Sequence, residues 1–176
     1  MVSIALFPAA PLFAAKGIEK ESPFFLVKKP TLVVRPLQTS VERVYLPLLD
    51  KYTWQFTVPV SVQAIGATAY MTPYTSSEVV PTTNLGRFFE GGAYITGAVT
   101  IGTYTDAPLS PEGNIIIHSG EVEEITFIIE YTEDLMSLDT PYYAALKRIR
   151  WNTTDSPSMY MTKFLNTHFM TEEIYL

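Results

Sequence analysis

The sequence contains no cysteine, and only two of its 176 residues are histidines. Without thiols, disulfide frameworks, Cys-based zinc sites, iron–sulfur clusters and thiol nucleophiles are all excluded. His118 and His168 are 50 residues apart, so neither has a second histidine at metal-ligand spacing. We therefore expect no metal and no other cofactor.

Other signatures of catalysis are also missing. A nucleotide-binding loop has glycines between a strand and a helix, whereas Gly91 and Gly92 precede a predicted strand, and Ser119 lacks the turn of a serine hydrolase. Glu123 and Glu130 could be the two acids of a glycoside hydrolase, but their odd spacing puts them on opposite faces of one strand. We therefore expect a protein that is not an enzyme and has no small-molecule substrate. A hydrolase using two acids between residues 121 and 139 is an alternative.

Charged residues make up only 17% of the chain, against about 25% in an average globular protein. Hydrophobic residues make up 47%, which is enough to build a core, and the length suits one domain. No stretch has the roughly 18 apolar residues of a transmembrane helix, so we expect no membrane span.

Basic residues are scarce in the middle of the chain. The net charge of −6 divides into +3 for residues 1–51, −10 for 52–146 and +1 for 147–176. This balance argues against nucleic acid as a partner. Seven carboxylates with no Lys or Arg among them form a predicted acidic face: Glu121, Glu123, Glu124, Glu130, Glu133, Asp134 and Asp139. The face either only aids solubility or complements a basic segment (16–43) of this chain or of a neighbouring copy.

Residues 1–40 predict an extended, proline-rich arm ahead of a single domain at 41–176. No basic residue precedes its apolar start, and Phe13 stands where signal cleavage needs a small residue, so we expect no secretory signal. The predicted contacts of the arm are five apolar and five basic side chains: Ile4, Leu6, Phe7, Leu12, Phe13, Lys16, Lys20, Lys28, Lys29 and Arg35. Such an arm needs a surface, either its own body or an adjacent subunit.

About 40% of the residues are Val, Ile, Thr or aromatic, which favours strands. The predicted strands are 24–27, 31–35, 41–48, 52–62, 64–71, 93–104, 114–118 and 122–131. Residues 52–62 alternate between apolar and polar, and Pro59 predicts an edge strand or a bulge there. The apolar runs 115–117 and 127–129 predict strands covered on both faces.

The fold class is therefore all-β, a mainly antiparallel β-sandwich or jelly-roll-like body with the arm and one or two short covering helices near the C-terminus. A helix is predicted over 141–150, because Thr140 is a suitable N-cap and Pro141 suits the first turn. Residues 158–169 fit either a second helix or a strand.

The chain resembles structural proteins of virus particles, bacteriophages especially. The resemblance rests on the prolines of the arm, on Thr/Val/Tyr-rich strands such as 52–62 and 93–104, and on the near absence of cysteine and histidine; the prolines are Pro8, Pro11, Pro23, Pro30 and Pro36. It implies a non-enzymatic capsid, decoration, connector or tail subunit that is made in the host cytoplasm and located in the virion. Its partners would be copies of itself and other virion proteins.

A carbohydrate- or ligand-binding β-sandwich is the alternative. Exposed aromatic rings stack on sugars, and a glycan screen would vary Trp54 and Tyr74. The cleft of the alternative hydrolase would be lined by Trp54, Tyr70, Tyr74 and Tyr104. Most aromatic residues fall on predicted inward faces, however, where core packing accounts for them.

Overall fold

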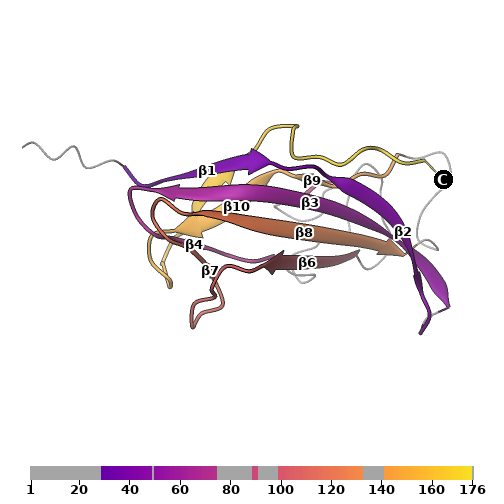
Figure 1. Ribbon diagram of the computed structural model, residues 1–176, viewed down its shortest axis with the longest axis horizontal. Coiled ribbons are helices and arrows are strands. Elements are labelled where there is room, and N and C mark those ends of the chain that lie inside the picture. The colour runs from indigo at the N-terminus through magenta and orange to yellow at the C-terminus, as the bar shows by residue number, and fades with distance from the viewer. Residues whose placement is uncertain (1–28, 49, 75–88, 91–98, 133–140, 176) are drawn as a thin grey trace, which may run out of the picture.

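The computed structural model describes residues 29–48, 50–74, 89–90, 99–132 and 141–175. Every regular element among them is a β-strand, as the composition predicts (Figure 1). The strands are β1 Thr31–Pro36, β2 Ser40–Leu46, β3 Lys51–Ile65, β4 Ala69–Met71, β5 Phe89–Glu90, β6 Val99–Thr105, β7 Ile115–Ile117, β8 Val122–Thr132, β9 Ala145–Leu146, β10 Arg148–Asn152 and β11 Met161–Phe164.

Two antiparallel sheets form the body. The first has five strands in the order β1-β3-β8-β6, with β2 also paired to β3, and the second has the order β11-β10-β4-β7. The short pair β5–β9 makes a third sheet. The chain passes from the first sheet to the second between β3 and β4 and again between β6 and β7, so both sheets are assembled from distant parts of the sequence.

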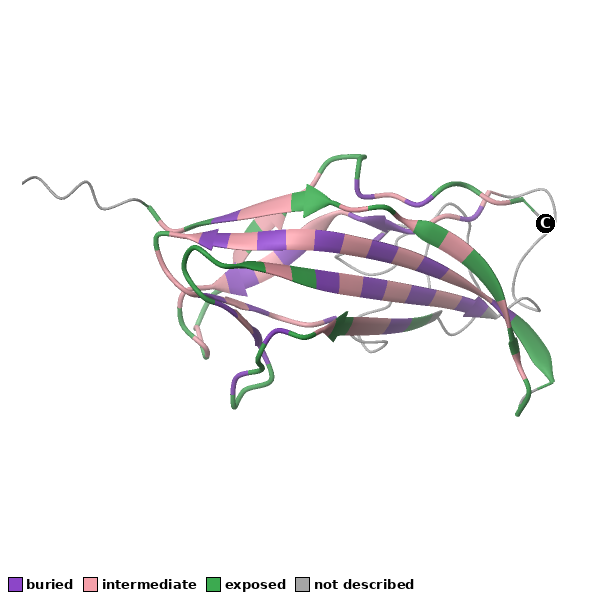
Figure 2. Ribbon diagram, in the orientation of Figure 1, coloured by how far each residue is buried: buried purple, intermediate pink, exposed green. Residues whose placement is uncertain are grey.

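Buried and less buried side chains alternate along β3 and β8, so one face of the larger sheet points into the core (Figure 2). The even-numbered residues of β3 from Phe56 to Ala64 are fully buried, and so are the odd-numbered residues of β8 from Ile125 to Ile129. The inward face predicted for 52–62 is confirmed from Phe56 to Val62, but its start is wrong, because Tyr52 is 42% exposed and Thr53 is buried. The predicted coverage of 115–117 and 127–129 on both faces is wrong for the described residues, because Ile116 and Ile128 are only half-buried.

Pro59 does not mark an edge strand, which corrects the prediction. β3 is an interior strand between β1 and β2 on one side and β8 on the other. The carbonyl of Pro59 accepts a hydrogen bond from the Leu37 N–H at 3.1 Å, so the proline nitrogen also faces that side. The pairing register changes by one residue between β1 and β2. The bulge therefore lies in the neighbouring strand, at the position where the missing N–H of Pro59 falls.

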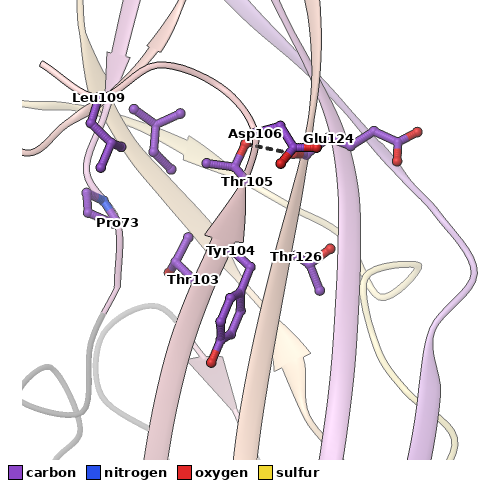
Figure 3. A pocket seen from close by; sticks show the side chains of 9 residues that line it. Pro73, Thr103, Tyr104, Thr105, Asp106, Leu109, Glu124 and Thr126 are labelled. Atoms are coloured by element: carbon purple, nitrogen blue, oxygen red, sulfur yellow. Dashed lines mark hydrogen bonds between the residues drawn. The ribbon is translucent and has the colours of Figure 1, made fainter.

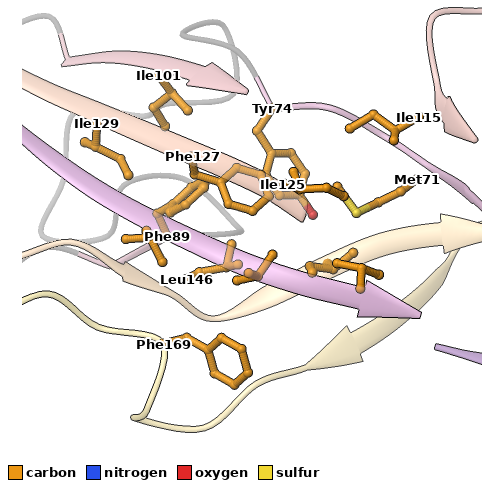
Figure 4. Close-up of a cluster of buried hydrophobic side chains, with 14 of the residues drawn as sticks. Met71, Tyr74, Phe89, Ile101, Ile115, Ile125, Phe127, Ile129, Leu146 and Phe169 are labelled. Atoms are coloured by element: carbon orange, nitrogen blue, oxygen red, sulfur yellow. The ribbon is translucent and has the colours of Figure 1, made fainter. Parts of the chain in front are cut away.

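The inner faces of both sheets meet in one core (Figure 4). Tyr74 is fully buried, and its ring lies 5.5 Å from that of Phe89 and 5.7 Å from that of Phe127. Its hydroxyl accepts a hydrogen bond from the Arg150 N–H at 2.8 Å and donates one to the Arg148 carbonyl at 3.2 Å. The side chain thus continues the ladder of β10 beyond the end of β4.

The helix predicted over 141–150 is wrong: this segment contains β9 and most of β10. The backbone N–H groups of Tyr142, Ala144 and Leu146 donate to acceptors in residues 169–174. These hydrogen bonds to residues 169–174 take the place of the intrahelical ones that a helix would form. The side chains of Tyr142, Ala144 and Leu146 are buried by this pairing. The open choice at 158–169 resolves in favour of a strand, β11. No helix is found in the described parts of the chain, so the expected covering helices are absent there.

Residues 31–36, which the sequence assigned to the arm, form β1 and pair with β3 along its last six residues. The predicted strand over 31–35 is confirmed. Residues 1–28, which contain the rest of the predicted arm and the predicted strand over 24–27, lie outside the described residues.

Candidate assembly surfaces

The outer face of the five-stranded sheet is the surface on which the predicted charges are displayed. It consists of the residues of β3 and β8 that point away from the core, together with their neighbours on β1, β2 and β6. Of the acidic set, Glu124 and Glu130 lie on this face. Glu121 is exposed just before β8, and Glu123 is half-buried near the start of that strand. Glu133, Asp134 and Asp139 lie outside the described residues.

Glu123 and Glu130 point to opposite faces of β8, as their spacing predicts, because β8 pairs regularly with β3 along its whole length. Glu130 lies opposite Gln55, whose side-chain amide donates a hydrogen bond of 2.6 Å to the Glu130 carboxylate. Glu42 lies opposite Gln55 on the other side. Two carboxylates therefore flank one amide in a row across three strands.

The two predicted basic arm residues that fall within the described residues lie at the edge of the same sheet. Lys29 is exposed immediately before β1, and Arg35 is exposed on β1 itself. Arg35 is paired in register with Ser61, and Ser61 with Glu124. The structure thus brings Arg35 and Glu124 onto one face but leaves a strand between them. The other predicted arm residues, Ile4, Leu6, Phe7, Leu12, Phe13, Lys16, Lys20 and Lys28, lie outside the described residues.

The β2–β3 hairpin presents exposed apolar side chains that the sequence analysis missed. Figure 1 shows the hairpin extending past the end of β8. Tyr45 and Tyr52 pair across it with ring centroids 5.1 Å apart, and the Arg43 guanidinium lies 4.0 Å from the Tyr52 ring centroid. Leu48 at its tip is 100% exposed. Two tyrosines at matching distances from the short turn at 47–50 are the sequence signal that could have revealed this pair.

The Tyr45 hydroxyl fastens the hairpin turn. It donates a hydrogen bond of 2.6 Å to the carboxylate of Asp50, and Asp50 has a left-handed backbone with φ of 50°. The hydrogen bond favours the protonated phenol and so raises the pKa of Tyr45. A tied turn with an exposed leucine at its tip makes a defined protrusion from the body.

On the outer face of the smaller sheet, arginines lie over aromatic rings. The Arg148 guanidinium is 5.6 Å from the ring centroid of Phe164, and that of Arg150 is 4.7 Å from the ring centroid of Tyr160. Both arginines lie in the segment that was predicted to be a helix. Because the segment is a strand, they pack against β11 and the residue before it instead.

His118 and His168 are both exposed, and no group of three acidic or histidine side chains among the described residues could hold a metal ion. Within the same residues no helix is long and apolar enough to cross a membrane. Of the two residues predicted for sugar stacking, Tyr74 is fully buried and Trp54 is half-buried against the core. Of the other rings of the predicted cleft, Tyr70 is half-buried and Tyr104 is exposed.

Comparisons with known proteins add no relative: no family model, curated protein or solved structure matches the chain. The assignment of function therefore depends on the geometry and charge of the surfaces described above.

Proposed function

We propose that the protein is a non-enzymatic structural subunit of a virion, a capsid, decoration, connector or tail component of a phage or virus. It assembles with copies of itself and with other virion proteins after synthesis in the host cytoplasm. An all-β sandwich whose chain passes repeatedly between its sheets is compatible with a jelly-roll-like subunit.

The observation that carries the proposal is the separation of opposite charges on one sheet. Arg35 lies on the edge strand β1, within the basic segment 16–43, and Glu124 lies two strands away with Ser61 between them. Charges displayed in this way complement each other between copies, when the edge of one subunit meets the acidic face of the next. Such a head-to-tail contact can build a ring or a filament.

The apolar half of the contact comes from the arm. Prolines prevent the arm from forming a helix of its own, and its side chains Ile4, Leu6, Phe7, Leu12 and Phe13 fill grooves on a neighbouring copy. Burying each of them contributes about 1.5–3 kcal/mol as an upper bound, before the entropy lost on ordering the arm.

The apolar contact is tested by deleting residues 2–15 and comparing the sizes of the assemblies by light scattering. A matched variant replaces the five apolar arm side chains with serine and so keeps the length and charge of the arm. Both variants are expected to lose assembly while the body stays folded, as judged by circular dichroism. Unchanged assembly in both would refute the role of the arm.

The charge contact is tested with Arg35→Glu and Glu124→Lys. Each single variant is expected to assemble more weakly, and a mixture of the two is expected to recover, because each then meets an opposite charge on the other. Raising the salt to about 1 M, where screening acts over about 3 Å, should weaken the wild-type contact. If the mixture behaves like either single variant, these two residues do not meet between copies.

A further inference from the structure

An open groove of about 660 Å³ borders the second half of β6 and the loop after it (Figure 3). Apolar atoms come from Pro73, Leu109, Ile115 and the ring of Tyr104, while Asp106, Glu124 and several threonines contribute polar atoms. None of the described lining residues is basic. The groove therefore combines an aromatic ring, aliphatic contacts and two carboxylates.

Tyr104 gives the groove a flat, accessible ring. Its side chain is 59% exposed, and its ring lies back along β6 over Gly102. A Cβ built on Gly102 would come within 2.7 Å of the Tyr104 Cε2 atom. Only glycine at this position leaves the ring where it is, so Gly102 sets the position of Tyr104.

Some polar groups of the groove already have partners. Thr103 exchanges two hydrogen bonds with the backbone of Tyr74, and the Thr105 hydroxyl donates to the Glu124 carbonyl and accepts from the Ala107 N–H. These bonds fix the wall of the groove.

The remaining polar groups face solvent. The side chains of Tyr104, Asp106, Glu124 and Thr126 make no hydrogen bond to another side chain or backbone group among the described residues. Two carboxylates and two hydroxyls at one groove supply several acceptors and two donors.

We propose that this groove binds an uncharged oligosaccharide, with a pyranose ring stacked on Tyr104. A sugar ring has C–H groups that pack on an aromatic face, and its hydroxyls donate strong hydrogen bonds to carboxylates. Asp106 and Glu124 would repel acidic sugars such as sialylated or sulfated glycans. The proposal uses none of the arm residues but shares Glu124 with the proposed charge contact. Tyr104 and Gly102 lie outside that contact, so variants at these two positions test the groove separately from assembly.

The experiment is an NMR titration of the full chain with cellohexaose, maltohexaose and chitohexaose. We expect at least one of them to shift the amide signals of Glu124 and Thr126, with a dissociation constant of about 1 mM or tighter. Tyr104→Ala should weaken that binding about ten-fold or more, whereas Tyr104→Phe should retain most of it. Tyr175→Ala, which removes a similarly exposed tyrosine elsewhere, serves as the matched control and should change nothing.

Gly102→Ala is the sharper variant. The three atoms nearest to the added methyl group all belong to the end of the flexible Tyr104 side chain, so folding should be unaffected while the ring moves. We expect a several-fold loss of affinity at unchanged melting temperature. No binding of any of the three sugars at about 10 mM would overturn the proposal, as would equal binding by wild type and Tyr104→Ala. A synthetic peptide of residues 1–28 that shifts the same signals when all the sugars fail would instead identify a peptide groove.

Discussion

The hydroxyl of Tyr74 provides a quantitative test of how the two sheets are joined. It accepts a hydrogen bond from the Arg150 N–H at 2.8 Å and donates one to the Arg148 carbonyl at 3.2 Å. Tyr74 is fully buried in the core. Tyr74→Phe removes this one oxygen and preserves the ring contacts with Phe89 and Phe127. The variant therefore isolates the two hydrogen bonds from the packing.

The expected loss follows from the two backbone groups that the variant leaves without a partner. A buried donor or acceptor without a partner costs about 1–3 kcal/mol, and the Arg150 N–H loses a short bond while the Arg148 carbonyl loses a longer one. We expect the free energy of unfolding to fall by about 2 kcal/mol. For a chain of this size that corresponds to a melting temperature about 4–8 °C lower.

The assay is thermal and urea unfolding followed by circular dichroism. Tyr175→Phe is the control, because the Tyr175 hydroxyl lies in an exposed position and donates a hydrogen bond of 3.3 Å to the exposed Glu173 carboxylate. Its melting temperature should match that of the wild type. A change of less than about 1 °C in Tyr74→Phe would show that β10 does not depend on this hydroxyl for its hydrogen bonds.

Three further predictions follow from the backbone and from titrating groups. Pro59→Val should change the free energy of unfolding by less than about 1 kcal/mol, whereas Ser61→Pro should lower it by about 1–3 kcal/mol by removing an N–H that faces β1; equal effects in urea unfolding would contradict the placement of the bulge. Burial raises the pKa of Tyr131 far above its ordinary value of 10.0, so the neutral phenol is favoured in the fold and stability should fall as the pH rises above 10.0. Tyr131→Phe should flatten that fall, and unfolding curves of equal steepness in pH would refute it. Hydrogen bonding from the Asn114 amide lowers the pKa of Asp155 below its ordinary value of 3.8; NMR titration should show this, with a higher midpoint in Asn114→Ala.

The larger sheet was predictable because its signal is local. The residues of 56–62 alternate along one strand, and the fold keeps that alternation as burial. The spacing of Glu123 and Glu130 likewise determined their opposite faces. Pro59 alone could not show that the bulge lies in the strand paired with β3. The bulge is formed by residues 37–39, which lie about 20 positions earlier in the chain.

The error at 141–150 has a different cause. The spacing of the apolar residues fits one face of a helix, and it also fits a strand whose alternation of buried and exposed side chains moves by one residue. The residues concerned are Tyr142, Leu146 and Ile149. The decision depends on residues 169–174, which provide backbone partners that local sequence does not reveal. For the surfaces, the contact between Gln55 and Glu130 joins residues 75 apart, and it too was beyond prediction. Gly102 two residues before Tyr104 was a readable signal, since both fall on one face of a predicted strand.

Assembly is the central claim, and the sedimentation velocity of the unmodified full chain over a concentration series measures it most directly. The account predicts species larger than a monomer that grow with concentration and become smaller in about 1 M salt. A single monomeric species at every concentration and salt would contradict it.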